Sequence, residues 1–520
     1  MTIKSTLRFT RISAALGLAL ATMGMAQAAD TTRVIVEFKS EAQAEAAARK
    51  ALAMLGGKIK LEMIGGGSVA AEVPTKALAS LRGHAAIADV SIDAPRYALS
   101  TSTPSGPPYM TGQQTPYGIK LVQADLVPNL DANAANRKLC IIDSGYDNSH
   151  EDLAGNDVTG EFDSGTGWWY TDENSHGTHV AGTIAAINNS GVGVVGVNPN
   201  KKLKLHIVKV FGADGWAYSS TLSNAAKKCQ AAGANIISMS LGGSLNNPLE
   251  SKVFADLQTA GILSIAAAGN GGNTKTSYPA GYKSVVSVGG VDMNKALYTA
   301  SQRNKDVEIA GPAVAVLSTV PMGKGTNSAL TVASTTYAPG GMAGSPNGTV
   351  TAPLADFGLG KVVDTAMAGK VCLIQRGEIA FSDKVLNCQN SGGVGAIVYN
   401  NIAGGFGGTL GGTATTIQSV TASDAEGAAM LSQVGQSATI TVTASNYAEF
   451  DGTSMATPHV AAVAALVWSH YPTCTGEQIR ASLNKSALDL GTAGRDTSFG
   501  YGLVQAKAAY DRIKKRGCGN

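Results

Sequence analysis

Short apolar segments alternate with helical stretches along the middle of the chain, and this alternation constrains the fold more than any other feature. Each apolar segment has the length of a buried strand, and the stretches between them are long enough for helices. We expect strands at Leu139–Ile142, Lys204–Val210, Asn235–Met239, Ile262–Ala267 and Val285–Val288, and helices at Thr178–Ile187, Thr221–Ala232 and Pro248–Ala260. Continuous apolar strands separated by helices predict an α/β domain whose parallel sheet is covered by helices on both faces.

Polar residues come just after several of these strands. Asp143, Ser240 and Asn270 each follow an apolar run. In parallel sheets of this kind, active sites gather at the carboxyl ends of the strands. We therefore expect these three side chains to meet along one edge of the sheet.

The first 29 residues have the pattern of a secretory signal. Lys4, Arg8 and Arg11 precede an apolar run from Ile12 to Met25, and Ala26-Gln27-Ala28 follows. The alternative is a membrane anchor, but the run is short for a span of about 20 residues. We expect export, with cleavage near Ala28 or Ala29, a secreted product and no membrane attachment.

Cysteine usage and net charge limit the compartment and the kinds of partner that suit this protein. The chain has 6 cysteines, all after residue 139, which suit disulfides in an oxidising compartment but allow 15 pairings. No CxxC motif is present, so a zinc ribbon or a redox site is disfavoured. The net charge is only +3, which argues against nucleic acid as a partner.

Two further regions differ from the sheet domain in amino-acid composition and in the pattern of expected strands and helices. Residues 30–98 alternate strands and helices in a small unit, and a stretch rich in Pro, Ser, Gly and Thr follows from Leu99 to Thr115, as expected of a linker. Residues 325–445 are rich in Gly, Thr and Ser and include a compact strand–loop–helix–strand patch from Val371 to Asn401. Because the first pattern returns at Tyr447 with a long alanine-rich helix, we interpret 325–445 as a domain inserted into the sheet domain.

Three widely spaced signals carry chemistry: Asp143 in CIIDSG, His176 in HGTH, and Ser454 in GTSMATPHVAA. Hydrolysis of an unactivated amide needs an activated nucleophile, a base that titrates near neutral pH, and a group that orients this base. A serine hydroxyl, an imidazole and a carboxylate divide the work in that way.

Each signal has a simpler interpretation. Asp143 could merely end a strand, and Ser454 could be the N-cap of an apolar helix, a role compatible with catalysis. Pro458 lacks an N–H, so the carbonyl of Ser454 loses its helical partner. Asn270 in AAAGNGG could be an ordinary loop residue; its functional interpretation is a donor to an oxyanion beside the backbone N–H of Ser454.

Together the motifs are far more specific, and the chain resembles a subtilisin-type serine protease. LCIIDSG, HGTHVAGT, SMSLGG, AAAGN and GTSMATPHVA occur in the order Asp, His, Ser that this family uses. The resemblance covers roughly residues 113–325 and 446–515. Ala461 stands where the family commonly has glycine, a change that does not touch the chemistry.

The resemblance implies a role for each matching residue. Asp143 would orient His176, His176 would be general base and acid, Ser454 the nucleophile and Asn270 the oxyanion donor. The walls of the substrate pocket would come from Ser240, Leu241, Gly242, Gly243, Ala267 and Gly269. His179 would be a buried structural histidine.

The resemblance also implies the domain organisation. A signal peptide (1–29) would precede an inhibitory propeptide (30–98) and a maturation region (99–112), cleaved within Leu99 to Tyr109. The catalytic domain would comprise 113–324 and 446–520, interrupted by a region (325–445) that holds a protease-associated domain. With this organisation we expect the disulfides Cys372–Cys388, Cys474–Cys518 and, by remainder, Cys140–Cys229.

A calcium site matches a further family pattern. Side-chain oxygens and loop carbonyls would ligate the ion, and such hard oxygen ligands suit Ca²⁺. The expected ligands are Gln113, Asp152, Ile187, Asn189 and Val194. This loop is one residue longer after Ser190 than the commonest family form, and an ordinary Asn/Gly turn is the alternative.

Competing functions are disfavoured by particular residues. A zinc hydrolase would place its histidines four apart with a glutamate between, as in HExxH, whereas His176 and His179 are three apart around Gly and Thr. A catalytically dead binding protein would lack a triad member, and a serine carboxyl protease would have an acid in place of His176. We expect a monomeric endopeptidase that acts on proteins or peptides, with its own propeptide as inhibitor, structural Ca²⁺ and no catalytic metal.

Overall fold

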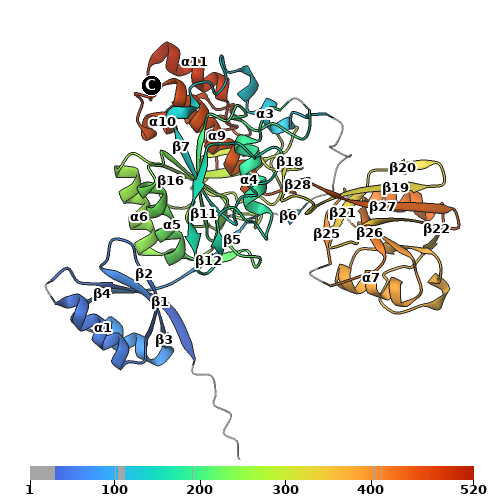
Figure 1. Ribbon diagram of the computed structural model, residues 1–520, viewed down its shortest axis with the longest axis horizontal. Helices are drawn as coiled ribbons and strands as arrows, with labels where there is room; N and C mark the ends of the chain where they lie inside the picture. Colours follow the sequence, from blue (N-terminus) through green and yellow to red (C-terminus); the bar gives the residue numbers. More distant parts are fainter. Residues whose placement is uncertain are drawn as a thin grey trace, which may run out of the picture.

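The computed structural model describes residues 30–41, 43–99, 101–102, 112–189, 191–401, 404–410 and 413–520. The expected signal peptide and most of the expected maturation region lie outside this range. Figure 1 shows a central sheet-and-helix body, an N-terminal unit below it and a separate domain to one side, with the C-terminus at the top of the central body.

A seven-stranded sheet forms the centre of the central body, with the strand order β17-β16-β15-β13-β7-β11-β8. All the pairings in it are parallel, so the expected α/β fold with a doubly covered parallel sheet is confirmed. Its strands are β7 (Lys138–Asp143), β8 (Val158–Gly160), β11 (Lys204–Lys209), β13 (Ile236–Met239), β15 (Leu263–Ala267), β16 (Val285–Val291) and β17 (Ile309–Pro312). The two edge strands, β8 and β17, were not foreseen, because β8 is short and mostly polar and β17 (Ile309–Pro312) is short and contains Gly and Pro, which are typical of turns.

Helices cover both faces of this sheet (Figure 1). On one face lie α5 (Ser219–Ala231) and α6 (Pro248–Thr259), and on the other lie α4 (His176–Ala185) and α9 (Thr453–His470). Helix α9 is buried along almost its whole length, which explains its many alanines, since small side chains allow neighbouring strands and helices to approach closely. The C-terminal helices α10 (Gly476–Ser486) and α11 (Ala506–Arg516) pack beside it.

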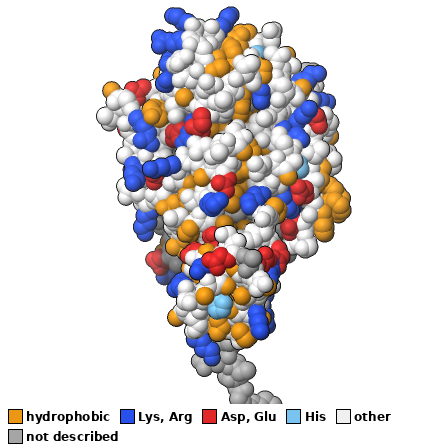
Figure 2. Space-filling view, turned by 90° about the vertical axis from the view of Figure 1, so that its left-hand side faces the viewer, with side chains coloured by type: hydrophobic (Ala, Val, Ile, Leu, Met, Phe, Trp, Pro, Cys, Tyr) orange, Lys and Arg blue, Asp and Glu red, His pale blue; other side chains and the backbone are white. Residues whose placement is uncertain are grey.

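The N-terminal unit is a four-stranded antiparallel sheet in the order β2-β3-β1-β4, with a hydrophobic core beneath α1 (Ala44–Met54) and α2 (Leu78–Arg82). Its strands are β1 (Thr31–Phe38), β2 (Lys58–Glu62), β3 (Ser68–Pro74) and β4 (Ile87–Ile92). It contacts the start of α5 and α6: Asn224 donates to the carbonyl of Glu62 at 2.9 Å, and Asn247 donates to that of Ile92 at 2.9 Å. Figure 2 shows this unit as a narrower lobe below the central body, with basic and acidic side chains interspersed over the visible face.

The side domain is built on a nine-stranded sheet, whose strands begin with β19 at Gly325 and end with β27 at Ser445. Its order is β20-β19-β27-β22-β23-β24-β26-β21-β25, and two helices, α7 (Phe381–Asn390) and α8 (Asp424–Leu431), accompany it. The remaining strands are β20 (Thr335–Tyr337), β21 (Gly340–Ala343), β22 (Gly348–Asp356), β23 (Val371–Gln375), β24 (Gly395–Tyr399), β25 (Gly408–Thr409) and β26 (Gln418–Ala422). It is joined to the central body by β18 (Val316–Thr319) and β28 (Tyr447–Asp451), which pair antiparallel.

Three disulfides are formed within these domains. Cys140–Cys229 links β7 to α5, Cys372–Cys388 links β23 to α7, and Cys474–Cys518 ties the segment before α10 to the chain end after α11. These are the pairs expected from the sequence. Among the described residues, no helix has the length and apolar character needed to cross a membrane.

Candidate active site

Asp143 and His176 form a buried pair at the carboxyl edge of the sheet. Asp143 is the last residue of β7, and His176 is the first residue of α4. Nδ1 of His176 lies 2.7 Å from Oδ1 of Asp143, which also accepts the backbone N–H of Ser144 at 2.7 Å. Nε2 of His176 is buried and has no hydrogen-bond partner among the described residues. The carboxylate thus holds Nδ1 of the imidazole, and the other ring nitrogen, Nε2, is free to take a proton.

Ser454 lies in the first turn of α9. The helix begins at Thr453 with Gly452 as its N-cap, so the N-cap role considered for Ser454 is wrong. Oγ of Ser454 donates to the carbonyl of Ser240 at 2.8 Å. In return, Oγ of Ser240 donates at 2.8 Å to the Ser454 carbonyl, whose usual helical donor is missing because residue 458 is proline. This exchange fixes the start of α9 against the end of β13.

Two donors converge on a single peptide carbonyl beside this serine. Nδ2 of Asn270 donates to the carbonyl oxygen of Leu99 at 2.7 Å, and the backbone N–H of Ser454 donates to the same oxygen at 3.4 Å. Oδ1 of Asn270 accepts the N–H of Thr453 at 2.9 Å and its hydroxyl at 2.8 Å, which sets the orientation of the amide. Asp143, Ser240 and Asn270 come at or just after the ends of the neighbouring parallel strands β7, β13 and β15, so they lie along one edge of the sheet, as expected.

The segment that delivers Leu99 occupies the cleft as an added strand. Strand β5 (Pro95–Ala98) lies between β12 (Trp216–Tyr218) and β14 (Leu241–Gly242) and pairs antiparallel with both. The N–H of Leu99 then donates to the carbonyl of Ser240 at 3.3 Å. The composition after residue 98 predicted a linker, but Leu99 is held in the site. Nothing in that composition signals it; only the family resemblance pointed to cleavage in this stretch.

A pocket of about 320 Å³ lies beside Leu99. Of the residues expected to bind substrate, Gly242, Gly243 and Gly269 line it, together with Asn270, the expected oxyanion donor. Leu241 belongs to the wall strand β14 and is fully buried, and Ala267 lies inside β15 and is fully buried as well.

His179 has the structural role expected for it. Its Nε2 lies 2.9 Å from the carbonyl of Val316 and 3.1 Å from that of Ala448, and its ring stacks on Phe450 at 4.3 Å. Burial lowers the pKa of this imidazole to about 3. His179 is thus a neutral donor that fastens α4 to β18 and β28.

Oxygen atoms gather where a calcium ion was expected. Nε2 of Gln113 lies 2.9 Å from the carbonyl of Ile187 and 3.2 Å from Oδ1 of Asn189, and Nδ2 of Asn189 lies 2.6 Å from Oδ1 of Asp152. Rotation of an amide exchanges its N–H₂ group and its oxygen, so the oxygen of Gln113 would then face the carbonyl of Ile187 and that of Asn189 would face Asp152. The N–H of Val194 donates to Oδ2 of Asp152 at 2.7 Å, while Ser190 lies outside the described residues. No group of three or more His, Cys, Asp or Glu side chains gathers in the described part of the chain, but a set with one carboxylate and neutral oxygens fits Ca²⁺.

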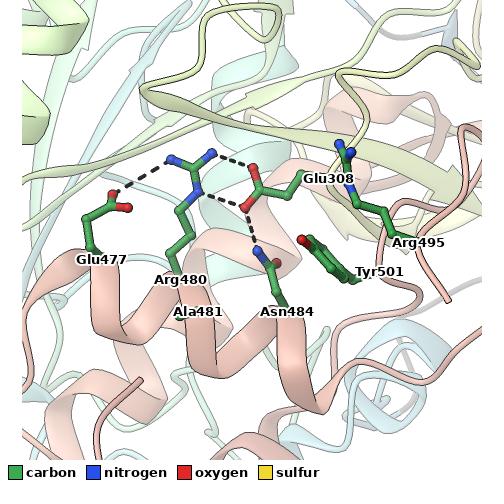
Figure 3. A pocket seen from close by; sticks show the side chains of 7 residues that line it. All are labelled: Glu308, Glu477, Arg480, Ala481, Asn484, Arg495 and Tyr501. Carbon is green, nitrogen blue, oxygen red and sulfur yellow. Dashed lines mark hydrogen bonds and ion pairs between the residues drawn. The ribbon is translucent and has the colours of Figure 1, made fainter. Parts of the chain in front are cut away.

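A second polar pocket lies on the other side of the body, along α10 (Figure 3). Arg480 forms an ion pair with Glu308, and Asn484 donates to the same carboxylate at 2.7 Å. Arg495 donates to the backbone carbonyls of Lys305 and Val307. These charges satisfy one another and hold α10 against the edge of the sheet near β17.

An aspartate–histidine pair, a serine at a helix start and two N–H donors on one peptide carbonyl are the groups that a serine protease uses. The subtilase family matches residues 134–353 and 409–502, and the PA domain matches residues 311–430. The chain belongs to the subtilase family and is a subtilisin-like serine endopeptidase that carries a PA domain.

Individual relatives support this assignment. The chain is 39% identical to subtilisin DY of Bacillus licheniformis over 214 residues, which is 40% of this chain and 76% of the relative. It is 29% identical to the alkaline elastase YaB of Bacillus sp. (strain YaB) over 406 residues, or 77% of this chain and 71% of the relative. The crystal structure of the psychrophilic subtilisin-like protease Apa1 from the Antarctic psychrotroph Pseudoalteromonas sp. AS-11 matches with a TM-score of 0.59 and 41% identity, covering 78% of this chain and 100% of the other.

Proposed function

We propose that this subtilase hydrolyses peptide bonds through Asp143, His176 and Ser454, and that it is made as a secreted, self-processing zymogen. The observation that carries the proposal is the carbonyl of Leu99, which accepts hydrogen bonds from Asn270 and from the backbone of Ser454 beside the serine hydroxyl. A peptide bound in this way presents its carbonyl carbon to the nucleophile.

The chemistry begins when Ser454 Oγ leaves the carbonyl of Ser240 and donates to the free Nε2 of His176. His176 accepts the proton as Oγ bonds to the carbonyl carbon, and Asp143 stabilises the imidazolium through Nδ1. The C–N bond then breaks as His176 returns the proton to the leaving amine, which leaves an acyl-enzyme on Ser454. Water repeats the two proton transfers and releases the acid.

Asn270 and the backbone N–H of Ser454 stabilise the negative charge that develops on the substrate oxygen. Because Thr453 holds the amide oxygen of Asn270, the N–H₂ group is already aimed at that oxygen and needs no reorganisation. Removal of the corresponding asparagine of subtilisin lowers kcat by about 10²–10³, and Asn270→Ala is expected to cause a loss of similar size.

The N-terminal unit acts as an intramolecular inhibitor until it is cut away. Its last strand fills the cleft with backbone pairing on both sides, and Leu99 lies in the position of the residue before the cleaved bond. Self-cleavage is therefore proposed between Leu99 and Ser100. The apolar run of residues 12–25 and the disulfides support export into an oxidising compartment, where the protease would act as a monomer.

The test combines active-site labelling with mapping of the new N-terminus. A fluorophosphonate probe is expected to label Ser454 of the processed enzyme, whose N-terminus should be Ser100 before any later trimming. Ser454→Ala should abolish labelling and leave the chain uncut, and the neighbouring variant Ser469→Ala on the same helix should process normally. Self-cleavage or peptidase activity in Ser454→Ala would refute the serine mechanism.

We also propose that Gln113, Asp152, Asn189 and the loop carbonyls hold a structural Ca²⁺ ion. Burial raises the pKa of Asp152, and a bound cation would compensate the charge of this carboxylate. Calcium chelation is expected to lower the unfolding temperature of the wild type but not that of Asp152→Asn. Equal unfolding temperatures with and without calcium in the wild type would contradict the site.

A further inference from the structure

Arg96 is the fourth residue of the segment in the cleft, counted back from the bond proposed to be cleaved. It is a charged side chain that is fully buried, and it is among the largest fully buried side chains of the molecule. The backbone of this segment pairs with both walls of the cleft. Arg96 lies opposite Ala217 of β12, and Tyr97 lies opposite Gly242 of β14. The register of the cleft, rather than the fold of the N-terminal unit, therefore sets where this side chain points.

Its partner is Glu250, which belongs to the catalytic domain. Nε of Arg96 donates to Oε1 of Glu250 at 3.1 Å, and Nη2 donates to Oε2 at 2.6 Å, so that guanidinium and carboxylate meet as two forks. Both side chains have no exposed surface. A charge taken out of water at such depth is tolerated only when it is paired and fully hydrogen-bonded.

The catalytic domain supplies the other contacts that complete this pair. Oη of Tyr282 donates to Oε2 of Glu250 at 2.6 Å, and the carbonyl of Leu245 accepts Nη2 of Arg96 at 3.0 Å. Nη1 of Arg96 donates at 3.0 Å to the carbonyl of Pro95, on its own strand. The backbone approaches closely here, because a Cβ at Gly243 would lie 2.3 Å from that carbonyl. Glu250, Tyr282 and the carbonyl of Leu245 thus form an acidic socket that remains with the enzyme after the N-terminal segment leaves.

We propose that this socket is a specificity subsite of the mature protease, which selects substrates with arginine at the fourth position before the cleaved bond. The inference rests on the proposed function, since it takes the segment from Arg96 to Leu99 as a model of bound substrate. Arginine suits the socket better than lysine, because only a guanidinium presents two parallel N–H donors to a carboxylate. An uncharged side chain in that position would leave a carboxylate buried without a counter-charge.

Burial raises the pKa of Glu250, and Arg96 beside it acts in the opposite direction by stabilising the carboxylate. In the precursor the cation is Arg96 of the same chain. In the mature enzyme the substrate must supply this cation. The contact that Arg96 makes in the precursor is therefore a contact that selects substrates in the mature enzyme.

The experiment compares matched peptides with the wild-type mature enzyme. Three quenched peptides carry the residues from position 97 to Ser100 and differ only at the fourth position before the bond, which is arginine, citrulline or alanine. Citrulline has almost the shape of arginine but no charge. We expect kcat/KM for the arginine peptide to exceed that for the citrulline peptide by at least about tenfold. Equal values for the two peptides would overturn the proposal.

Two variants assign the preference to the socket. Glu250→Gln should bring the ratio for arginine over citrulline close to one, whereas the matched variant Glu308→Gln, which alters the other arginine–glutamate pair, should keep the wild-type ratio. If Glu250→Gln does not mature, Tyr282→Phe, which removes one hydrogen bond to the carboxylate, should lower the ratio part of the way. An unchanged ratio in these socket variants would refute the assignment. Failure of the proposed function would look different, since no peptide would be cut and no probe would label Ser454.

Discussion

Two arginine–glutamate pairs have the same chemistry but differ in burial and in the parts of the molecule that they join. One is Arg96 with Glu250, and the other is Arg480 with Glu308. In both, Nε and Nη2 of the arginine meet the two carboxylate oxygens. The first pair has no exposed surface, whereas the side chains of Arg480 and Glu308 remain 15% and 10% exposed. The first joins the N-terminal segment to the catalytic domain, and the second joins two elements of the catalytic domain itself.

This difference shows that burial alone does not define the role of an ion pair. Arg480 remains beside Glu308 for as long as the domain is folded, so that pair can contribute only to stability. On the function proposed above, Arg96 leaves with the segment that carries it, and Glu250 is then available to another guanidinium. A buried pair across a cleavable boundary can therefore act in recognition, while the other pair cannot.

Removing the arginine of the first pair is expected to have the largest effect on stability. In the uncleaved Ser454→Ala precursor, Arg96→Met leaves Glu250 buried without a counter-charge. We expect a loss of about 3–5 kcal/mol in the free energy of unfolding, measured by denaturant titration. The double variant Arg96→Met/Glu250→Leu should regain most of it, because the unpaired charge is gone. A loss below about 1 kcal/mol in the single variant would mean that water reaches Glu250 and that the socket is not dry.

Much of the fold and several residues of the candidate site could be predicted from local sequence. The strands around β7, β13 and β15 were predicted closely, because each is a continuous apolar run. Asp143, His176 and Asn270 were singled out from local motifs, but distant partners orient two of them: Asp143 holds His176, and Thr453 holds the amide of Asn270. Ser454 was expected at a helix start and lies there, although Gly452 rather than the serine caps the helix.

The socket could not be predicted in the same way. Arg96 and Glu250 are 154 residues apart, and each one alone has the appearance of an ordinary surface charge. Glu250 follows Asn247 and Pro248 in the first turn of α6, where an acidic residue is expected simply because it interacts well with the helix N-terminus. Only the pairing of β5 with β12 and β14 brings the two charges together, and this pairing depends on backbone hydrogen bonds that leave no side-chain pattern in the sequence.

A second prediction uses pH to separate the two pairs in the mature enzyme. The pKa of Glu250 is raised by burial, and the guanidinium of a substrate stays charged throughout. The carboxylate form that attracts arginine is therefore present above the pKa of Glu250 and is lost as the pH falls through it. Tyr282, the other titratable group of the enzyme that faces this carboxyl, stays neutral because burial raises its pKa, and Arg96 and Asp93 have left with the N-terminal segment.

We expect the preference for the arginine peptide over the citrulline peptide to fall by about tenfold, or about 1.4 kcal/mol, toward acid pH. The measurement is the ratio of the two kcat/KM values across pH, which cancels any pH dependence common to both peptides because they use the same catalytic groups. Glu250→Gln should give a low ratio that does not change with pH, and Glu308→Gln should follow the wild type. A ratio that is constant with pH in the wild type, while the arginine preference is present, would assign the preference to a group other than Glu250.

The smallest effect is expected from removing the arginine of the second pair. Arg480→Met leaves Glu308 within reach of water, and Asn484 still donates to its Oε1 at 2.7 Å. Because the carboxylate keeps a hydrogen bond and gains hydration, we expect a loss of only about 1 kcal/mol in the free energy of unfolding, with no change in the arginine preference. The matched measurement is the same denaturant titration in the same Ser454→Ala precursor, followed by peptide kinetics in the active enzyme. A loss as large as that of Arg96→Met would show that exposure does not separate the two pairs. A changed peptide preference would show that α10 and the substrate cleft are coupled, and the division between a stability pair and a recognition pair would then fail.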